Sequence, residues 1–316
     1  MSPTEGTASL SSADVLLLDA AVGTELSRRG TDTSAPLWSA RSLRGDGASL
    51  REIHADDAAA GADILTAATF RTHARNLAAS GVSLALARQE ADLLTRKAVA
   101  LAREGGALGR ARANVSRRPV LVAGSLSPLE DCYRPDLCPA ADELEREQEE
   151  QAQRLAASGV DVIVVETMSS LREAVSAARA ATATGLAVVL TFVSDGRGKL
   201  LSGEDLEDAV RAVFSAAGPL LAVGVNCLPA RLVEGELLRI AGALPNYPLA
   251  AWGNTGRALD EAAGLYTEPI SPTAYAAFAE RWISSGARIV GGCCGTNSRH
   301  TAALRQMLDL RAGQRA

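Results

Sequence analysis

The chain has 316 residues, of which 47% are hydrophobic and 22% charged, and its formal net charge is −5. This length fits one large α/β barrel or two small domains, and no apolar run reaches the ~18–20 residues that a membrane-spanning helix needs. The mildly acidic balance argues against a nucleic-acid-binding protein, which would carry a basic face.

The N-terminal segment is rich in Ser, Thr, Gly and Ala, and it has neither the basic region nor the apolar core of a secretory signal. We therefore predict a disordered tail over residues 1–13, followed by a single domain over residues 14–316. The chain has five cysteines, an odd number. Together with the missing export signal, this argues against a disulfide framework and favours a location in the reducing cytoplasm.

The rest of the chain alternates between short apolar runs and helical stretches rich in Ala and Leu. Most of the runs are continuously apolar, which is typical of parallel strands buried on both faces. The eight predicted strands cover residues 15–19, 64–70, 120–125, 160–167, 187–193, 220–227, 249–254 and 288–294. The main predicted helices cover residues 50–60, 83–104, 141–157, 171–182, 205–216, 232–243, 273–284 and 298–310.

Eight strand–helix units with parallel character predict a (β/α)8 barrel. A doubly wound open sheet is the alternative, but it would more often show five to seven strands and a G-x-G-x-x-G loop after the first strand. No such loop occurs, and no linker interrupts the middle of the chain. The widest gap between units, residues 127–140, contains three prolines and is predicted to be a long loop.

Active sites of such barrels lie at the C-terminal ends of the strands. Polar or sulfur-containing side chains end most of the predicted strands, and we expect them to converge on one mouth. These residues are Asp19, Thr69, Ser125, Glu166, Asn226, Cys227, Asn254, Cys293 and Cys294.

Three of these residues, Cys227, Cys293 and Cys294, form a candidate metal site. Three thiolates fill three of the four tetrahedral positions that Zn²⁺ prefers and leave one open, as in catalytic zinc sites. The alternative is that they are ordinary buried cysteines. The glycines that surround the pair, at 291, 292 and 295, favour a close backbone approach to a metal or ligand.

Asp19 and Glu166 each end an apolar strand, and buried carboxylates are costly unless they are paired. Either they cap helices or pair with arginines, or they bind a cationic group such as the ammonium of an amino acid. Convergence on one mouth favours the second interpretation. The three histidines form no metal-binding spacing, and His54 and His300 are interpreted as surface or helix residues.

Taken together, these segments resemble the homocysteine S-methyltransferase family, which includes S-methylmethionine-dependent and betaine-dependent enzymes and the homocysteine module of cobalamin-dependent methionine synthase. The resemblance extends over roughly residues 14–312. It is carried by six motifs in family order: LLLDAAVGTEL at 16–26, PLWSA at 36–40, VAGS at 122–125, VETM at 165–168, GVNC at 224–227 and GGCCGT at 291–296.

The resemblance implies a (β/α)8 barrel that binds zinc through Cys227, Cys293 and Cys294, with the homocysteine thiol in the open zinc position. It also implies that Asp19 and Glu166 lie near the amino end of homocysteine. Thr69, Asn226 and Asn254 match polar positions at the mouth and are predicted to bind substrate. The family often has glycine where this chain has Ala20, and this difference bears on how the acceptor sits.

The methyl donor is less directly indicated. The predicted barrel fills the 316 residues, so we expect no cobalamin- or folate-binding module, and only 3% of the residues are aromatic. Because an aromatic cage is expected around betaine, a sulfonium donor, S-methylmethionine or S-adenosylmethionine, is the preferred prediction. Another thiol or selenol acceptor, a betaine-type donor, and a zinc- or thiol-binding protein without turnover are the alternatives. The predicted partners are these small molecules, with no nucleic acid or membrane, and the sequence gives no oligomeric state.

Overall fold

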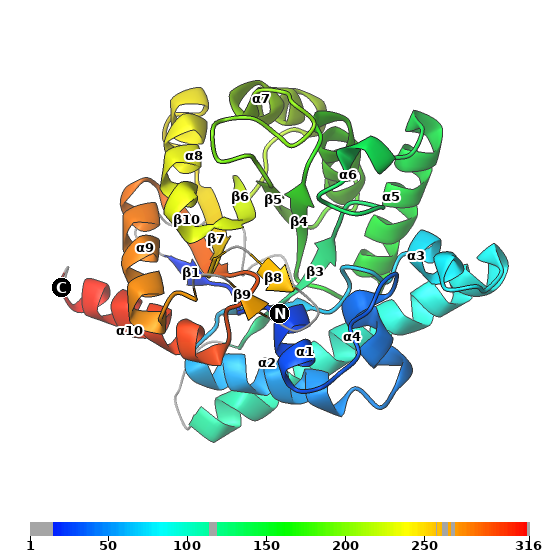
Figure 1. The fold of residues 1–316 in the computed structure, drawn as a ribbon, viewed down its shortest axis with the longest axis horizontal. Helices are drawn as coiled ribbons and strands as arrows, with labels where there is room; N and C mark the ends of the chain where they lie inside the picture. The colour runs from blue at the N-terminus through cyan, green and yellow to red at the C-terminus, as the bar shows by residue number, and fades with distance from the viewer. Residues whose placement is uncertain (1–14, 114–118, 257, 261–264, 267–268, 315–316) are drawn as a thin grey trace.

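The computed structural model describes residues 15–113, 119–256, 258–260, 265–266 and 269–314. Their backbone forms a parallel barrel surrounded by a ring of helices (Figure 1). The predicted (β/α)8 fold is therefore confirmed. The tail predicted at residues 1–13 lies outside the described residues.

The eight barrel strands follow one another in the order β1-β10-β7-β6-β5-β4-β3-β2, with every pairing parallel. A parallel bridge between Leu18 and Ile64 joins β1 to β2 and closes the barrel. The strands are β1 Leu16–Leu17, β2 Ile64–Ala67, β3 Leu121–Leu126, β4 Val162–Met168, β5 Ala187–Phe192, β6 Ala222–Pro229, β7 Leu249–Asn254 and β10 Ala287–Gly292. All eight predicted strands are thus present.

The eight predicted helices are also present, and α4 runs nine residues further than predicted. They are α2 Ala48–Ala60, α4 Leu84–Ala113, α5 Ala141–Ala157, α6 Leu171–Thr182, α7 Leu206–Ala217, α8 Ala230–Ala243, α9 Pro272–Ser284 and α10 Ser298–Gly313. The short elements were not predicted. These are α1 Val22–Arg28, α3 Ala74–Ala79, the 3-10 helices Trp38–Arg44 and Pro135–Leu137, and the antiparallel pair β8 Ala258–Asp260 and β9 Leu265–Tyr266.

Two layers of apolar side chains hold the barrel together. The larger layer lies between the strands and the helices, and a smaller cluster around Trp252 fills the inside of the barrel. Close strand packing inside the barrel requires small residues: a Cβ added at Gly224 would lie 1.7 Å from the carbonyl oxygen of Ala250. The barrel interior is therefore a packed core, and space for a ligand remains only at its mouth.

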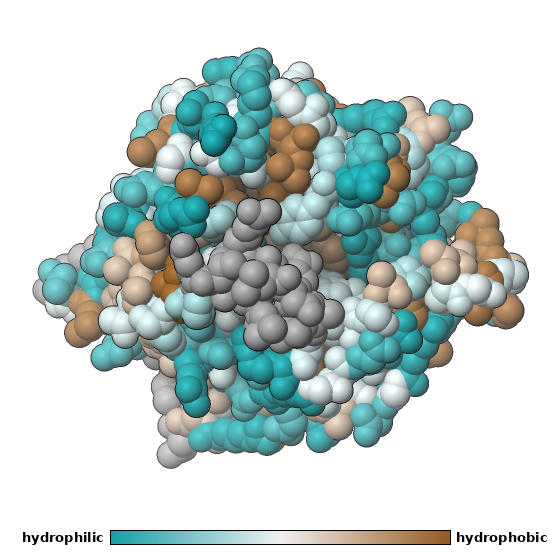
Figure 2. Space-filling model, viewed as in Figure 1, coloured by the Kyte–Doolittle hydropathy of each residue, from teal (hydrophilic) through white to brown (hydrophobic). Residues whose placement is uncertain are grey.

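Figure 2 shows the molecule from the same direction, with hydrophilic residues over most of this face and hydrophobic ones gathered beside α7 and α8. Within the described residues, no helix combines the length and apolar character needed to cross a bilayer.

Candidate functional site

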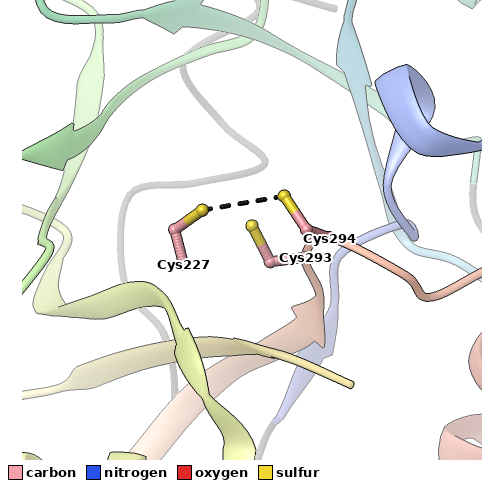
Figure 3. A group of neighbouring side chains, drawn as sticks. All are labelled: Cys227, Cys293 and Cys294. Atoms are coloured by element: carbon pink, nitrogen blue, oxygen red, sulfur yellow. Dashed lines mark hydrogen bonds between the residues drawn. The ribbon is translucent and has the colours of Figure 1, made fainter. Parts of the chain in front are cut away.

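The three predicted cysteines come together at the mouth of the barrel. Cys227 lies near the end of β6, and Cys293 and Cys294 directly follow β10. The Sγ atoms of Cys227 and Cys294 are 3.7 Å apart, and all three Sγ atoms lie within 4.8 Å of one another. Figure 3 shows the three sulfur atoms pointing toward a common space.

The backbone at the strand ends turns these side chains toward one another. The register between β6 and β7 shifts after Asn226, and Cys227 adopts a left-handed conformation with φ of 59°. After β10 the chain turns tightly, and the Thr296 hydroxyl donates a hydrogen bond to the carbonyl oxygen of Cys293 at 2.7 Å. A Cβ at Gly292 would lie 2.3 Å from this hydroxyl oxygen, so glycine is needed at that position.

The sulfur geometry fits a tetrahedral metal ion. Zn–S bonds of about 2.3 Å in a tetrahedron place sulfur atoms roughly 3.8 Å apart. The 3.7 Å distance between Cys227 and Cys294 matches this spacing, whereas a disulfide would require about 2.05 Å. All five cysteines are free thiols.

The three thiols have unequal acidities. Hydrogen bonds from Cys293 and Cys294 lower the pKa of Cys227 well below its usual value, and the same contacts raise the pKa of Cys293. The hydroxyl of Tyr133, from the loop between β3 and α5, lies 3.0 Å from the Cys227 sulfur and also lowers this pKa. These contacts favour the thiolate form of Cys227.

Asp19 lies two residues beyond the end of β1 and is only 1% exposed. Its carboxylate accepts hydrogen bonds from the backbone N–H of Thr66 at 2.8 Å and from the Thr66 hydroxyl at 2.9 Å. Burial, followed by the charge of nearby Asp57, raises the pKa of Asp19 well above its ordinary value. A cation entering the mouth would stabilise the ionised form of Asp19.

Glu166, near the end of β4, is the second carboxylate at the mouth. The Ser125 hydroxyl donates to its Oε1 at 2.6 Å, and the Trp252 indole N–H donates to its Oε2 at 3.4 Å. Burial is the main cause that raises its pKa to about 7. Both carboxylates line the same cavity as the three cysteines, as the sequence predicted.

The remaining predicted site residues lie behind the cavity. Thr69 joins β2 to β3, since its hydroxyl accepts from Ser125 N–H at 2.9 Å and donates to Ser125 O at 3.0 Å. The Oδ1 of Asn226 accepts from Thr167 N–H and the Thr191 hydroxyl, both at 2.9 Å. Protein groups use these polar atoms, and neither Thr69 nor Asn226 lines the cavity, so their role in binding substrate stays a prediction.

Asn254 is buried at the end of β7 and contacts the thiol of Cys227, whose pKa it helps to lower. Within the part of the chain that the structure describes, its Oδ1 has no hydrogen-bond partner. Asn254 therefore belongs to the surroundings of the cysteine cluster.

A cavity of about 400 Å³ extends from the cysteines and carboxylates to the outside. Four aromatic side chains that the sequence places near loops or strand ends all line it: Trp38, Phe70, Tyr133 and Trp252. The rings of Trp38 and Phe70 meet edge to face with centroids 5.4 Å apart. The sequence did not predict a role for Thr66, Arg71 or Tyr133 at the site. Arg71 and Tyr133 lie in loops, and no motif or spacing in the sequence indicates any of the three.

The two histidines predicted to be surface or helix residues are buried helix residues. His54 and His300 do lie on helices, but neither is at the surface: His54 is fully buried on α2, and His300 is 6% exposed. The side chain of His54 points toward the barrel, since its Nδ1 atom lies 3.9 Å from the Asp19 carboxylate. Among the described residues, neither of its ring nitrogens has a hydrogen-bond partner.

The sequence of this barrel matches a known family model, described as homocysteine S-methyltransferase, over residues 16–308. The chain belongs to the homocysteine S-methyltransferase family. It is therefore a methyltransferase. A homocysteine S-methyltransferase of Escherichia coli (strain K12) is 30% identical, covering 92% of this chain and 94% of that protein.

Other relatives of this homocysteine S-methyltransferase family member differ in their named acceptor. A selenocysteine Se-methyltransferase of Brassica oleracea var. italica is 28% identical and covers 92% of this chain and 88% of its own length. The crystal structure of the homocysteine methyltransferase MmuM from Escherichia coli, in a metallated form, aligns with a TM-score of 0.80 at 27% identity. That alignment covers 96% of this chain and 99% of the other.

Ala20, which replaces a glycine common in this family, lines the cavity and is buried. It is not among the residues with positive φ, so alanine is accommodated there without backbone strain.

Proposed function

We propose that this protein transfers a methyl group from a sulfonium amino acid to the thiol of homocysteine, giving methionine, with zinc held by Cys227, Cys293 and Cys294. The observation that carries the proposal is the convergence of three thiols and two carboxylates on one cavity. Zinc held there would keep a thiol in the cavity deprotonated at neutral pH, and the thiolate is the nucleophile.

The carboxylates determine which acceptor fits. Asp19 and Glu166 offer two negative groups to an ammonium, while the cysteines mark the place of the acceptor sulfur. An amino acid with a short thiol side chain satisfies both requirements. Holding the acceptor at both ends orients its sulfur for in-line attack on the methyl carbon.

The transfer balances without a further reactant. A bond forms between the acceptor sulfur and the methyl carbon while the bond between that carbon and the donor sulfur breaks. The donor leaves as a neutral thioether, and the acceptor thiol loses its proton to solvent. With S-methylmethionine as donor, two molecules of methionine result.

Two observations favour testing another acceptor and another donor as well. The relatives include proteins named for methylating selenocysteine, so a selenol acceptor is the second candidate. The four aromatic side chains in the cavity suit any methylated onium group, including a quaternary ammonium.

The test uses zinc-loaded protein with isotope-labelled homocysteine and, separately, S-methylmethionine, S-adenosylmethionine and betaine. The label is needed because S-methylmethionine itself becomes methionine when it donates. Mass spectrometry should detect labelled methionine with a sulfonium donor, against protein-free and donor-free controls. Parallel reactions with selenocysteine compare the two acceptors. No labelled methionine from any donor, at one zinc per chain, would overturn the proposal.

A further inference from the structure

Arg71 is the one cationic side chain among the described residues that line the cavity, where four carboxylates also lie: Asp19, Glu130, Asp131 and Glu166. It follows Phe70 just beyond β2, and it is half-buried. A lone arginine in an otherwise acidic cavity points to a ligand that carries an anionic group as well as a cationic one.

No carboxylate in the described part of the chain pairs with the guanidinium of Arg71. Its Nη1 donates to the backbone carbonyl of Glu130 at 2.8 Å, and its guanidinium lies 5.2 Å from the centre of the Phe70 ring. The carboxylate of Glu130 is instead paired with Arg75 at 3.2 Å, and Arg75 also pairs with two more glutamates. Within the described ranges of the chain, Arg71 forms no ion pair, and its Nε and Nη2 donate no hydrogen bond.

The position of Arg71 suits contact with the methyl donor rather than with the acceptor. Asp19 is almost fully buried at the inner end of the cavity, beside the space faced by the cysteine sulfurs. Arg71 is more exposed than Asp19, bonds to the loop that carries Glu130 and lies over the ring of Phe70, which pairs with Trp38. A donor whose methyl group points inward to the acceptor sulfur would extend past these rings toward Arg71.

From this geometry we infer that Arg71 binds the carboxylate of the methyl donor, so that the donor is an onium compound that also carries a carboxylate. The inference rests on the methyl transfer proposed above. The aromatic rings of Trp38 and Phe70 face the onium group, and the planar guanidinium suits a carboxylate with two parallel hydrogen bonds. Fixing the donor at both ends favours the in-line approach of its methyl group.

The test compares Arg71→Gln with the unaltered protein, both zinc-loaded, using two donors. S-methyl-L-methionine has the carboxylate, and trimethylsulfonium does not. We expect the KM for S-methylmethionine to rise at least about 10-fold in the variant, because a hydrogen bond to a charged group is lost. The KM for homocysteine and the rate with trimethylsulfonium should change less than about 2-fold, and Arg71→Lys should recover part of the loss.

A matched control is Arg134→Gln, which removes one positive charge from the neighbouring loop, where Arg134 pairs with Asp136 outside the cavity. It should leave both donors unaffected. A rise in the KM for homocysteine instead of the donor, equal losses with both donors, or no change in Arg71→Gln would each overturn the inference.

Calorimetric titration separates this inference from the proposed reaction. S-methylmethionine is titrated into each protein without homocysteine, so that no turnover is needed. Weaker binding to Arg71→Gln than to the unaltered protein supports the carboxylate subsite even when no labelled methionine is formed. Equal binding to the two proteins, or none to either, contradicts it.

Discussion

The hydroxyl of Tyr133 lies 3.0 Å from the sulfur of Cys227, although 94 positions separate the two residues. The same hydroxyl is 3.3 Å from the carbonyl oxygen of Cys227. A loop residue thus reaches over the cysteine cluster and holds one of its three sulfurs in place. Such contacts around metal ligands fix the direction in which a ligand points.

Removing this hydroxyl should weaken metal binding. In Tyr133→Phe the zinc affinity, measured by competition with a chelator, is expected to fall by about 10-fold, because Cys227 loses a partner that orients it. The control is Tyr247→Phe, which loses a hydrogen bond to Leu220 far from the cysteines. That variant should change stability but not zinc affinity. Equal affinities in all three proteins would show that Tyr133 does not orient the sulfur.

Replacing one cysteine of the cluster should remove both metal and activity. We expect Cys294→Ala to retain far less than one zinc per chain after dialysis, because two thiolates and water bind zinc much more weakly than three thiolates. Metal content is measured by elemental analysis of the purified protein. Cys138→Ala is the matched control, since Cys138 lies outside the cavity. Full zinc loading of Cys294→Ala would refute the assignment.

Glu166 should contribute to acceptor binding. In Glu166→Gln the KM for homocysteine is expected to rise by about 10-fold, since an ammonium loses a charged hydrogen-bond partner. Steady-state kinetics with saturating donor measure this change. Asp208→Asn removes an exposed carboxylate on α7 and serves as the control. An unchanged KM for homocysteine in Glu166→Gln would place the ammonium elsewhere.

Trp38 depends on the absence of a side chain at position 23. A Cβ at Gly23 would lie 2.1 Å from the Trp38 ring, so Gly23→Ala must displace the ring from the cavity. We expect a loss of about 1–3 kcal/mol in the free energy of unfolding, together with a higher KM for the donor. Gly235→Ala, exposed in α8 with open space around it, should be neutral or stabilising. Urea unfolding distinguishes the two variants.

His54 should make stability depend on pH. Burial lowers its pKa to about 4 from 6.5. Between these values the unfolded chain binds a proton that the folded protein does not. The folded state therefore loses up to about 3 kcal/mol of stability from this residue as the pH falls from 6.5 to 4.

His54→Leu removes this titration. The stability of the unaltered protein relative to the variant, from urea unfolding at several pH values, should fall as the pH is lowered from 6.5 to 4. Asp57 affects stability in the opposite direction. Its pKa is raised to about 7 in the folded protein, so the stability that it contributes is lost as the pH rises. It is present in both proteins, so it largely cancels in the comparison. A difference that stays constant with pH would contradict the prediction.

Sequence patterns predicted the barrel because its strands are short apolar runs with a polar residue at the end. The same logic placed Asp19, Glu166 and the three cysteines at one mouth. The sequence did not distinguish side chains that face the cavity from those that form hydrogen bonds with neighbouring backbone groups. Asn226, which accepts a hydrogen bond from the backbone N–H of Thr167, is an example. The last N–H groups of a strand need partners, and a polar side chain at a strand end serves equally well for either purpose.

The loops could not be predicted in the same way. Tyr133 reaches the cavity because the segment between β3 and α5 folds back over the mouth, and Arg71, from the loop after β2, donates a hydrogen bond to Glu130 in that segment. Both contacts join residues distant in sequence. The prolines at 128, 135 and 139 marked the segment as irregular but gave no direction to its side chains.

Left-handed backbone at Thr167 and Cys227 has a consequence for how this protein can change. Their φ angles are 62° and 59°, and at such angles glycine has less backbone strain than a residue with a Cβ. Glycine at position 227 would therefore be expected to relax the backbone while deleting a thiol from the cluster. Backbone strain and the cysteine cluster therefore place opposite demands on position 227.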